Sequence, residues 1–158
     1  MRITSTFWIG AMASLALALP AAAHEEAGTA QVVPQEEKLR AQELLADGPT
    51  ETSGIGGVEM LGTVSLDGEF SSSDGLVMRV RELLINPGGI VAVHQHDNRP
   101  GIAYIIEGEM TEHRSSEPEG VVKAAGDVAF ESSGVVHWWE NTGDTPARAL
   151  VVDLVPAE

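Results

Sequence analysis

Three of the five histidines in this chain fall in two short segments, and two of them are spaced for metal binding. His94 and His96 lie two residues apart in the apolar segment from Pro87 to Gly108, and the segment from Gly126 to Asn141 adds His137. In an extended strand, residues i and i+2 point to the same face, so the imidazoles of the first pair point the same way. One strand can therefore offer two nitrogen ligands to a single metal ion.

The sequence pattern predicts that the elements carrying these histidines are β-strands. From Gly54 onward, short apolar alternations are separated by glycine, proline, asparagine and serine, which predicts many short strands and argues for an all-β sandwich or barrel. Strong turn signals stand at Pro87-Gly88-Gly89 and at 141–144. The strands predicted after residue 75 are 76–85, 90–96, 102–111, 121–124, 128–130, 135–140 and 147–155.

The residues before the predicted strands differ from them in composition and periodicity. Residues 24–33 are small, acidic and aperiodic, and we interpret them as a flexible leader. Pro34 then opens a predicted short helix over 35–47, ended by Gly48-Pro49. Three leucines, Leu39, Leu44 and Leu45, are expected to pack this helix against a single domain that spans residues 54–158.

The first 23 residues have the features of a secretory signal peptide. Arg2 supplies the positive start, 7–19 is an apolar stretch too short to span a bilayer, and the alanines 21–23 suit cleavage before His24. The alanine-rich signal suggests a bacterial source, so we expect a periplasmic or secreted product that leaves the membrane once the signal is cleaved. The chain has no cysteine, so its fold must hold by a hydrophobic core, helped by a metal or by self-association.

The net charge excludes one broad class of function. The formal charge is −15 at pH 7, from 24 acidic and 9 basic residues. Nucleic-acid binders need basic stripes, so we expect no nucleic-acid partner. The excess of acidic residues favours solubility but does not by itself identify a binding partner.

Two motifs together make the chain resemble the cupin superfamily, and in particular its small single-domain members. Gly89, His94, His96 and Gly108 match the first cupin motif, in which a glycine is followed by an HxH pair, a glutamate and a second glycine. The second motif is matched by Gly126, Gly134, His137 and Asn141, with Ser132 where the family usually has proline. The resemblance implies a jelly-roll β-barrel, also called a double-stranded β-helix, with a metal site in its mouth.

The same resemblance implies that His94, His96 and His137 are the metal ligands. Neutral imidazoles suit iron, zinc, manganese, nickel or copper as a divalent ion, and three of them leave the charge of the metal uncompensated. Such a centre is a good Lewis acid that can bind oxygen or an anionic substrate. The departure from the family lies at Gly101, which stands where the family has its glutamate ligand.

Three explanations for the missing glutamate stay open. The site can be a true three-histidine centre, similar to the thiol and diketone dioxygenases among cupins. Another side chain can fill the gap, or the barrel has lost its metal and keeps the histidines as polar groups of a pocket. The nearby candidates for a replacement ligand are Glu131, Glu112, His113 and Asp97.

Several residues around the histidines could shape a pocket or take part in catalysis. Arg99 could pair with a substrate carboxylate through its planar fork, or could be a surface arginine that offsets the many acids. Tyr104 could donate its hydroxyl to a ligand or pack in the core with that hydroxyl at the rim. Trp139 shares the strand parity of His137 and is expected to point inward as a pocket wall, with Glu131 as a second pocket residue.

Two classes of function follow from these residues. The first is a metal-dependent, oxygenase-like enzyme that acts on a small organic molecule. The second is a non-catalytic module that binds a metal or a small ligand in the periplasm. Cupins host both classes, so the fold does not decide between them. An outward Trp138 and edge-strand pairing also suggest a homodimer.

Overall fold

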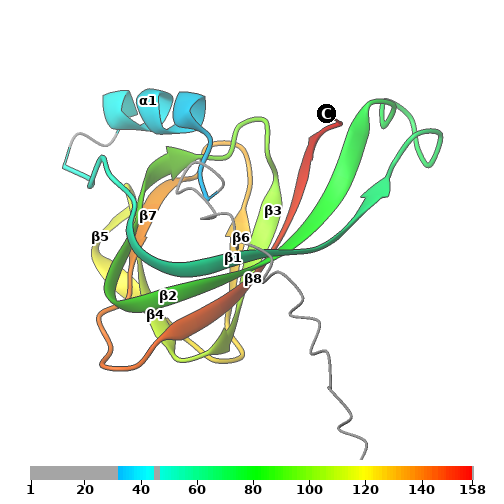
Figure 1. Ribbon diagram of the computed structural model, residues 1–158. Helices are drawn as coiled ribbons and strands as arrows, with labels where there is room; N and C mark the ends of the chain where they lie inside the picture. Colours follow the sequence, from blue (N-terminus) through cyan, green and yellow to red (C-terminus); the bar gives the residue numbers. More distant parts are fainter. Residues whose placement is uncertain (1–31, 45–46, 158) are drawn as a thin grey trace, which may run out of the picture.

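The part of the chain that the structure describes, residues 32–44 and 47–157 of a computed structural model, consists of one helix followed by eight strands. The strands curl into a nearly closed barrel with the helix packed across one end, which confirms the predicted all-β fold (Figure 1). The elements are α1 (Gln35–Leu44), β1 (Ser53–Ser65), β2 (Leu76–Gln95), β3 (Gly101–Glu107), β4 (Glu109–Arg114), β5 (Glu117–Ala124), β6 (Val128–Glu131), β7 (Val136–Glu140) and β8 (Ala147–Pro156).

Strand β2 organises the sheet because it pairs with three other strands. Neighbouring strands follow the order β5-β4-β7-β2-β8-β3-β6, and β1 pairs with β2 outside this path. The first half of β2, Leu76–Ile85, runs antiparallel to β8, and the second half, from Ile90 to Gln95, runs antiparallel to β7. A single long strand therefore joins two parts of the barrel wall.

The turn predicted at Pro87-Gly88-Gly89 is wrong, because β2 passes through these residues without reversing. Gly88 has a φ of 71°, a backbone conformation that glycine adopts without the steric cost that Cβ imposes on other residues. The β1 register shifts at the same place, where Ile55 pairs with Ile85 but Ser53 pairs with Ile90. The glycines thus form a bulge that redirects β2 from one partner strand to the next.

The core lies inside the barrel and follows the alternation of the strands. On β8, Ala147, Ala149 and Val151 are buried and the residues between them are partly exposed, as a half-buried strand requires. Ala103 on β3 and Ala129 on β6 belong to the same buried cluster. These small side chains leave space in the interior beside the larger Ile85, Ile105 and Trp139.

Helix α1 packs differently from the prediction. Leu39 and Leu44 are 55% and 66% exposed, so the expectation that they anchor the helix is wrong, and Leu45 lies outside the described residues. Ala41 is the buried contact instead, in a cluster with Val93 and Val136 against which Trp138 also packs. The helix therefore covers the outer face of the strand that carries His94 and His96.

The segment before the helix also departs from the prediction. Val32 and Val33 were assigned to a flexible leader, yet they are only 4% and 1% exposed and belong to the main core cluster. Their apolar side chains complete the interior at the end that α1 covers. The expected signal peptide over residues 1–23 and the rest of the leader, residues 24–31, lie outside the described residues.

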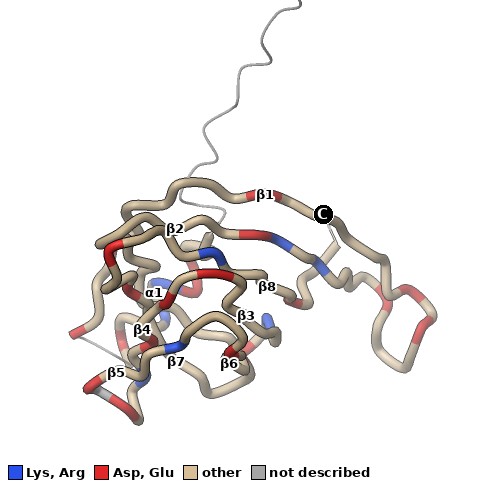
Figure 2. The backbone as a smooth tube through the Cα atoms, turned by 90° about the horizontal axis from the view of Figure 1, so that it is seen from below, with Lys and Arg blue, Asp and Glu red and all other residues tan. Residues whose placement is uncertain are grey.

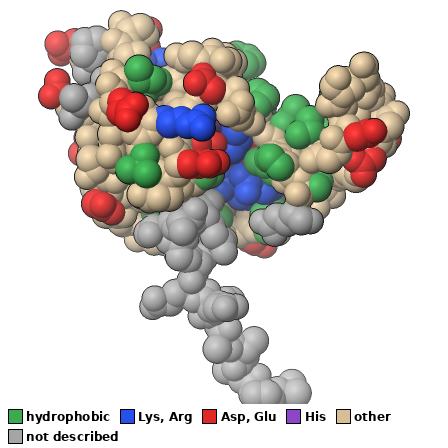
Figure 3. All heavy atoms as spheres, turned by 90° about the horizontal axis from the view of Figure 1, so that it is seen from above, with side chains coloured by type: hydrophobic (Ala, Val, Ile, Leu, Met, Phe, Trp, Pro, Cys, Tyr) green, Lys and Arg blue, Asp and Glu red, His purple; other side chains and the backbone are tan. Residues whose placement is uncertain are grey.

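Acidic residues are spread along the strands and turns of the backbone, and the fewer basic residues lie among them on several elements (Figure 2). Viewed from above, hydrophobic side chains gather between the barrel and the arm that β1 and β2 form beyond it (Figure 3). A groove of about 500 Å³ lies there between α1, β1, β2 and the end of β8. In residues 32–44 and 47–157, no helix is long and apolar enough to cross a membrane.

Candidate metal centre

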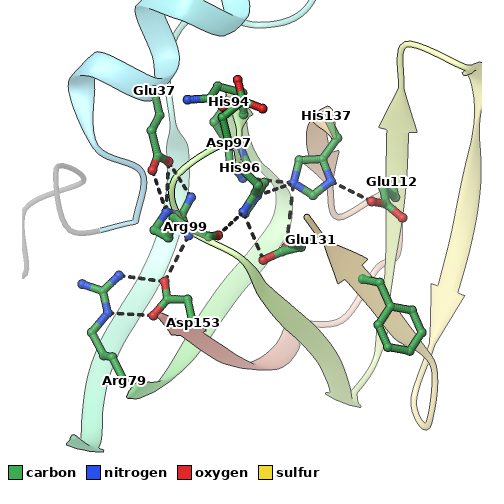
Figure 4. A network of polar contacts seen from close by, with 12 residues as sticks. Glu37, Arg79, His94, His96, Asp97, Arg99, Glu112, Glu131, His137 and Asp153 are labelled. Atoms are coloured by element: carbon green, nitrogen blue, oxygen red, sulfur yellow. Dashed lines mark hydrogen bonds and ion pairs between the residues drawn. The ribbon is translucent and has the colours of Figure 1, made fainter. Parts of the chain in front are cut away.

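Strand β2, the residue that follows it and strand β7 bring the three histidines together inside the barrel (Figure 4). His94 on β2 is the register partner of His137 on β7, and directly opposed residues of an antiparallel pair present their side chains on the same face. A register shift between Val91 and His94 lets both of these residues point inward despite their odd spacing. His96 follows on the same face as His94, as the spacing predicted.

The Nδ1 atoms of the three histidines each contact a group that can only accept a hydrogen bond. His94 Nδ1 lies 2.8 Å from the carbonyl oxygen of Ala92, and His96 Nδ1 lies 3.0 Å from that of Arg99. His137 Nδ1 lies 2.6 Å from a carboxylate oxygen of Glu112. Each Nδ1 must therefore carry the proton, which leaves each Nε2 with a free lone pair.

These three Nε2 atoms converge on one point. The Nε2 atoms of His96 and His137 are 2.9 Å apart, those of His137 and His94 are 3.1 Å apart, and all three lie within 4.8 Å of one another. Two donors that each lie about 2.1 Å from a metal ion, at right angles, are about 3 Å apart. The spacing and the chemistry of the three nitrogens thus fit a bound transition-metal ion.

Burial keeps the imidazoles neutral, which is the form that binds metal. It lowers the pKa of His94 and of His137 well below 6.5, and the neighbouring histidines lower both further. Burial, followed by the charge of Arg99, lowers the pKa of His96 to about 4. The three Nε2 donors are therefore unprotonated at neutral pH without help from a metal.

A carboxylate and an arginine hold His137 in place from behind. Glu112 on β4 is 1% exposed and accepts the Nδ1–H of His137, and its same oxygen accepts a 2.7 Å bond from Nε of Arg114. A carboxylate behind a ligating histidine fixes the ring orientation and raises the basicity of its other nitrogen. Glu112 faces the rear of the ring, so it supports a ligand and does not itself face the convergence point.

Glu131, at the end of β6, reaches the cluster from another side. One carboxylate oxygen, Oε1, lies 3.7 Å from Nε2 of His137, and Oε2 lies 3.7 Å from Nδ1 of His96. The side chain is 4% exposed, and Oε2 has no hydrogen-bond partner among residues 32–44 and 47–157. Burial raises the pKa of Glu131 to about 7, although the charge of Arg99 lowers it.

A small cavity of about 40 Å³ adjoins the cluster. Its wall is largely apolar and includes Val32 and Trp139, while His94, Arg81, Arg99 and Glu131 supply the polar groups. A cavity needs about 10–15 Å³ on this measure to hold one water molecule. The space therefore suits an ion with a ligand of a few atoms.

A buried network of arginines and carboxylates lies under the cavity and joins it to α1. Asp153 is 1% exposed and accepts hydrogen bonds from Arg79, Arg81 and Arg99. Arg99 also donates to Glu37 of α1, with its closest contact at 2.6 Å. Burial would raise the pKa of Asp153, but hydrogen bonding to Arg79 and the charges of the three arginines lower it below 3.8.

Arg99 and Tyr104, the candidate catalytic residues, occupy contrasting places. Arg99 is 4% exposed, so the surface alternative for it is wrong, and the carboxylates of Glu37 and Asp153 bind its guanidinium. Tyr104 is 38% exposed and alternates with the inward Ala103 and Ile105, so it lies on the outside of β3, away from the cluster. Arg81, the other arginine that lines the cavity, is also buried, and burial lowers its pKa to about 10, although the charge of Asp153 raises it.

The remaining candidates divide between the cavity and the outer face. Trp139 is 5% exposed, lines the cavity and lies edge-on to His137 with ring centroids 5.6 Å apart. Trp138 lies on the outer face, where it stacks on His113 with ring centroids 3.8 Å apart and packs against the cluster that contains Ala41 of α1. His113 is thereby placed outside the barrel, and Asp97 is exposed and accepts hydrogen bonds from Ser133 and Gly134.

The sequence indicated Arg99 but not its partners in the buried ionic network. Asp153 shares the inward parity of Val151, and Arg81 shares that of Leu83, so strand alternation could have placed both inside. Glu37 gives no comparable signal, because its partner Arg99 is 62 residues away and no local pattern links the helix to it.

The comparisons with known proteins agree with this architecture. A family model described as "Cupin domain" matches residues 81–153. An oxalate-binding protein of Thermotoga maritima is 39% identical over 69 residues, which cover 44% of this chain and 55% of that protein. Germin-like protein 1 of Brassica napus is 28% identical over 86 residues, which cover 52% of this chain and 42% of that protein. The chain thus spans about half the length of the curated relatives it matches.

Among solved structures, a protein described as a predicted oxalate decarboxylase from Thermotoga maritima is 25% identical to this chain. The alignment covers 66% of this chain and 98% of that one, with a TM-score of 0.45.

Replacing Arg99 by methionine tests the buried network, because the change leaves Glu37 without its partner and removes one of three from Asp153. We expect Arg99→Met to lower the free energy of unfolding by about 3 kcal/mol, measured by urea denaturation at pH 7. Asp153 is ionised in the folded protein down to a lowered pKa, so this loss should be largest at neutral pH and shrink as pH falls below 3.8.

The matched control is Arg148→Met, because Arg148 makes a comparable pair with Glu82 at the surface, where its side chain is 41% exposed. Exposed pairs contribute little to stability, so this variant should unfold at the wild-type denaturant concentration. If Arg99→Met and the wild type had the same free energy of unfolding, the buried network would not stabilise the fold as proposed.

Proposed function

Because this chain belongs to the cupin superfamily, we propose that it holds one divalent transition-metal ion on His94, His96 and His137 and binds a small carboxylate anion beside it. When bound, such an ion acts as a Lewis acid toward oxygen ligands. The observation that carries this proposal is the convergence of three Nε2 lone pairs, described above. Lone pairs about 3 Å apart repel one another, and a cation at their centre turns that repulsion into attraction.

The cavity supports a small anion as the second ligand. Its volume of about 40 Å³ suits a ligand of a few atoms, and Arg81 and Arg99 line its wall. Although carboxylates bind both arginines, their charges add to that of the metal and favour an anion over a neutral molecule. The 39% identity to an oxalate-binding protein makes oxalate the first compound to test.

An oxygenase-like enzyme is the second candidate function. The specific observation in its favour is that all three histidine donors are neutral, which leaves the charge of the metal available to substrate or oxygen. In this function the apolar wall around Trp139 would keep water from the reacting centre, and the buried network would keep the cavity in shape. A module that only binds the anion carries out no reaction at the metal.

Elemental analysis of the purified protein tests the metal centre. We expect close to one transition-metal ion per chain after reconstitution with Fe(II), Mn(II) or Zn(II), since the three nitrogens form one site. His94→Ala should lower metal affinity by at least about tenfold, because it removes one of the converging donors.

His113→Ala is the matched control, since His113 stacks on Trp138 outside the barrel and should leave the metal content unchanged. Wild-type protein that stays metal-free in all three metals, or a His94→Ala variant that retains them, would contradict the proposal.

The choice between binding module and enzyme calls for two measurements on the same metal-loaded protein. Titration calorimetry should detect oxalate binding by wild-type protein and none by His94→Ala. An oxygen electrode should then follow Fe(II)-loaded protein with oxalate and with a panel of thiols and diketones. Oxygen uptake above that of the His94→Ala control supports the enzyme, and oxalate binding with a flat oxygen trace supports the module. Absence of oxalate binding would contradict the proposed ligand.

We further propose that the chain is exported after cleavage before His24 and that it forms a homodimer. Export rests on the features of residues 1–23. Dimerisation rests on the arm, where Met60, Leu61, Val64 and Phe70 are each at least 49% exposed. Among the described residues, β1 pairs with β2 alone, so its other edge can pair with a second copy.

Native mass spectrometry of protein recovered from the periplasm tests both features at once. The expected species is a dimer of chains that start at His24. Met60→Glu should shift it to monomer by placing a charge on the arm. A monomer in the wild type would contradict dimerisation, and a chain that retains residues 1–23 would contradict cleavage and export.

A further inference from the structure

Position 101 cannot carry the side chain that the first cupin motif leads one to expect there. A Cβ on Gly101 would collide with the carbonyl oxygen of Val152 and would lie 3.0 Å from both Cα and Cβ of Asp153. These atoms belong to β8, which pairs with β3 directly at this point. The close approach of the two strands therefore requires glycine, and a glutamate could enter only if β8 moved away.

The register of the sheet places another carboxylate at the same level of the barrel. Gly101 on β3 pairs directly with Glu131 on β6. Opposed residues of an antiparallel pair present their side chains on the same face, about 5 Å apart at Cβ. The carboxylate absent from Gly101 is thus present one strand away and on the same face.

Glu131 is directed at the histidines. Its Oε1 lies 3.7 Å from Nε2 of His137, the nitrogen with the free lone pair, and the side chain lines the cavity together with His94 (Figure 4). Adjacent ligands of one metal ion lie about 3 Å apart, so a side-chain adjustment of less than about 1 Å brings this oxygen into the shell. The Oε1 atom therefore lies at the edge of the donor set formed by the three histidines.

The hydrogen bonding of Glu131 is incomplete for a buried carboxylate, although Arg81 and Arg99 line the same cavity. The side chain is 4% exposed, and its Oε2 has no hydrogen-bond partner among residues 32–44 and 47–157. The nearby Arg99 directs its hydrogen bonds to Glu37 and Asp153. Burying a carboxylate oxygen without a hydrogen bond is costly, and a metal ion on the histidines would offset that cost.

We infer that Glu131 is the fourth protein ligand of the metal, so that the carboxylate arm of the site comes from β6 and not from the strand that follows the HxH pair. This inference rests on the proposed metal site. A carboxylate ligand reduces the net charge of a divalent centre and favours the oxygen-preferring ions manganese and iron over copper. It also leaves fewer positions open, which suits a compact two-oxygen ligand such as oxalate.

Manganese(II) binding to the full chain and to two glutamate variants tests the inference. Glu131→Gln keeps the size of the side chain but removes its charge, and Glu140→Gln is the matched control on β7, next to the inward Trp139 but of opposite parity. We expect Glu131→Gln to weaken Mn(II) affinity by at least about tenfold and Glu140→Gln to leave it unchanged.

Electron–nuclear double resonance of Mn(II)-loaded protein, labelled with ¹³C at the glutamate carboxyl carbons, shows directly whether a carboxylate is bound. The expected ¹³C coupling of a coordinated carboxylate is present in wild type and Glu140→Gln and absent in Glu131→Gln. No such coupling in the wild type, or the same coupling and affinity in Glu131→Gln, would overturn the role of Glu131 while leaving the histidine site intact. Failure of wild-type protein to bind Mn(II) or any other transition metal would overturn both proposals.

Discussion

Inside this barrel the Nε2 atom of His137 lies about 3 Å from the Nε2 atoms of both His94 and His96, although none of the three carries a proton to share. The cause lies on the opposite side of each ring, where a backbone carbonyl or the Glu112 carboxylate takes the Nδ1 proton. The tautomers are therefore imposed by groups of β2 and β4 and of the loop between β2 and β3. Three features of the fold produce this arrangement: the bulge before His94 sets its direction, the β2–β7 register places His137 opposite, and α1 covers the outer face of β2 at Val93.

A second constraint comes from the charges beneath the cavity. Asp153 continues the inward alternation of β8, so a carboxylate is placed inside the barrel, where only close cations make it tolerable. Arg79, Arg81 and Arg99 supply them, and Arg99 extends the network to Glu37, which fastens α1 to the barrel. The same strand approaches β3 so closely at Val152 that only glycine fits at position 101. The packing of β8 therefore explains both the ionic floor of the cavity and the departure from the usual motif.

The sequence allowed the barrel and the shared face of His94 and His96 to be predicted, because strand alternation and HxH spacing are local properties. It also indicated that Trp139 points inward with His137. Contacts between distant segments could not be predicted from the sequence, because nothing near Glu37 or Arg99 in the chain indicates that these two residues meet. The burial of Val32 and Val33 was also not predictable, because they lie in a stretch without periodicity. At Gly88, local turn chemistry was outweighed by strand pairing on both sides. Glu131 was one of several named alternatives, and only the β3–β6 register singles it out.

Nitrogen-detected NMR of the histidine rings in metal-free protein tests the central claim most directly. The account predicts that His94, His96 and His137 all carry their proton on Nδ1 at neutral pH. One equivalent of zinc should then shift the Nε2 resonances of these three rings together and leave His113 unchanged. A proton on Nε2 of any of the three, or zinc-induced shifts that do not include all three, would contradict the account.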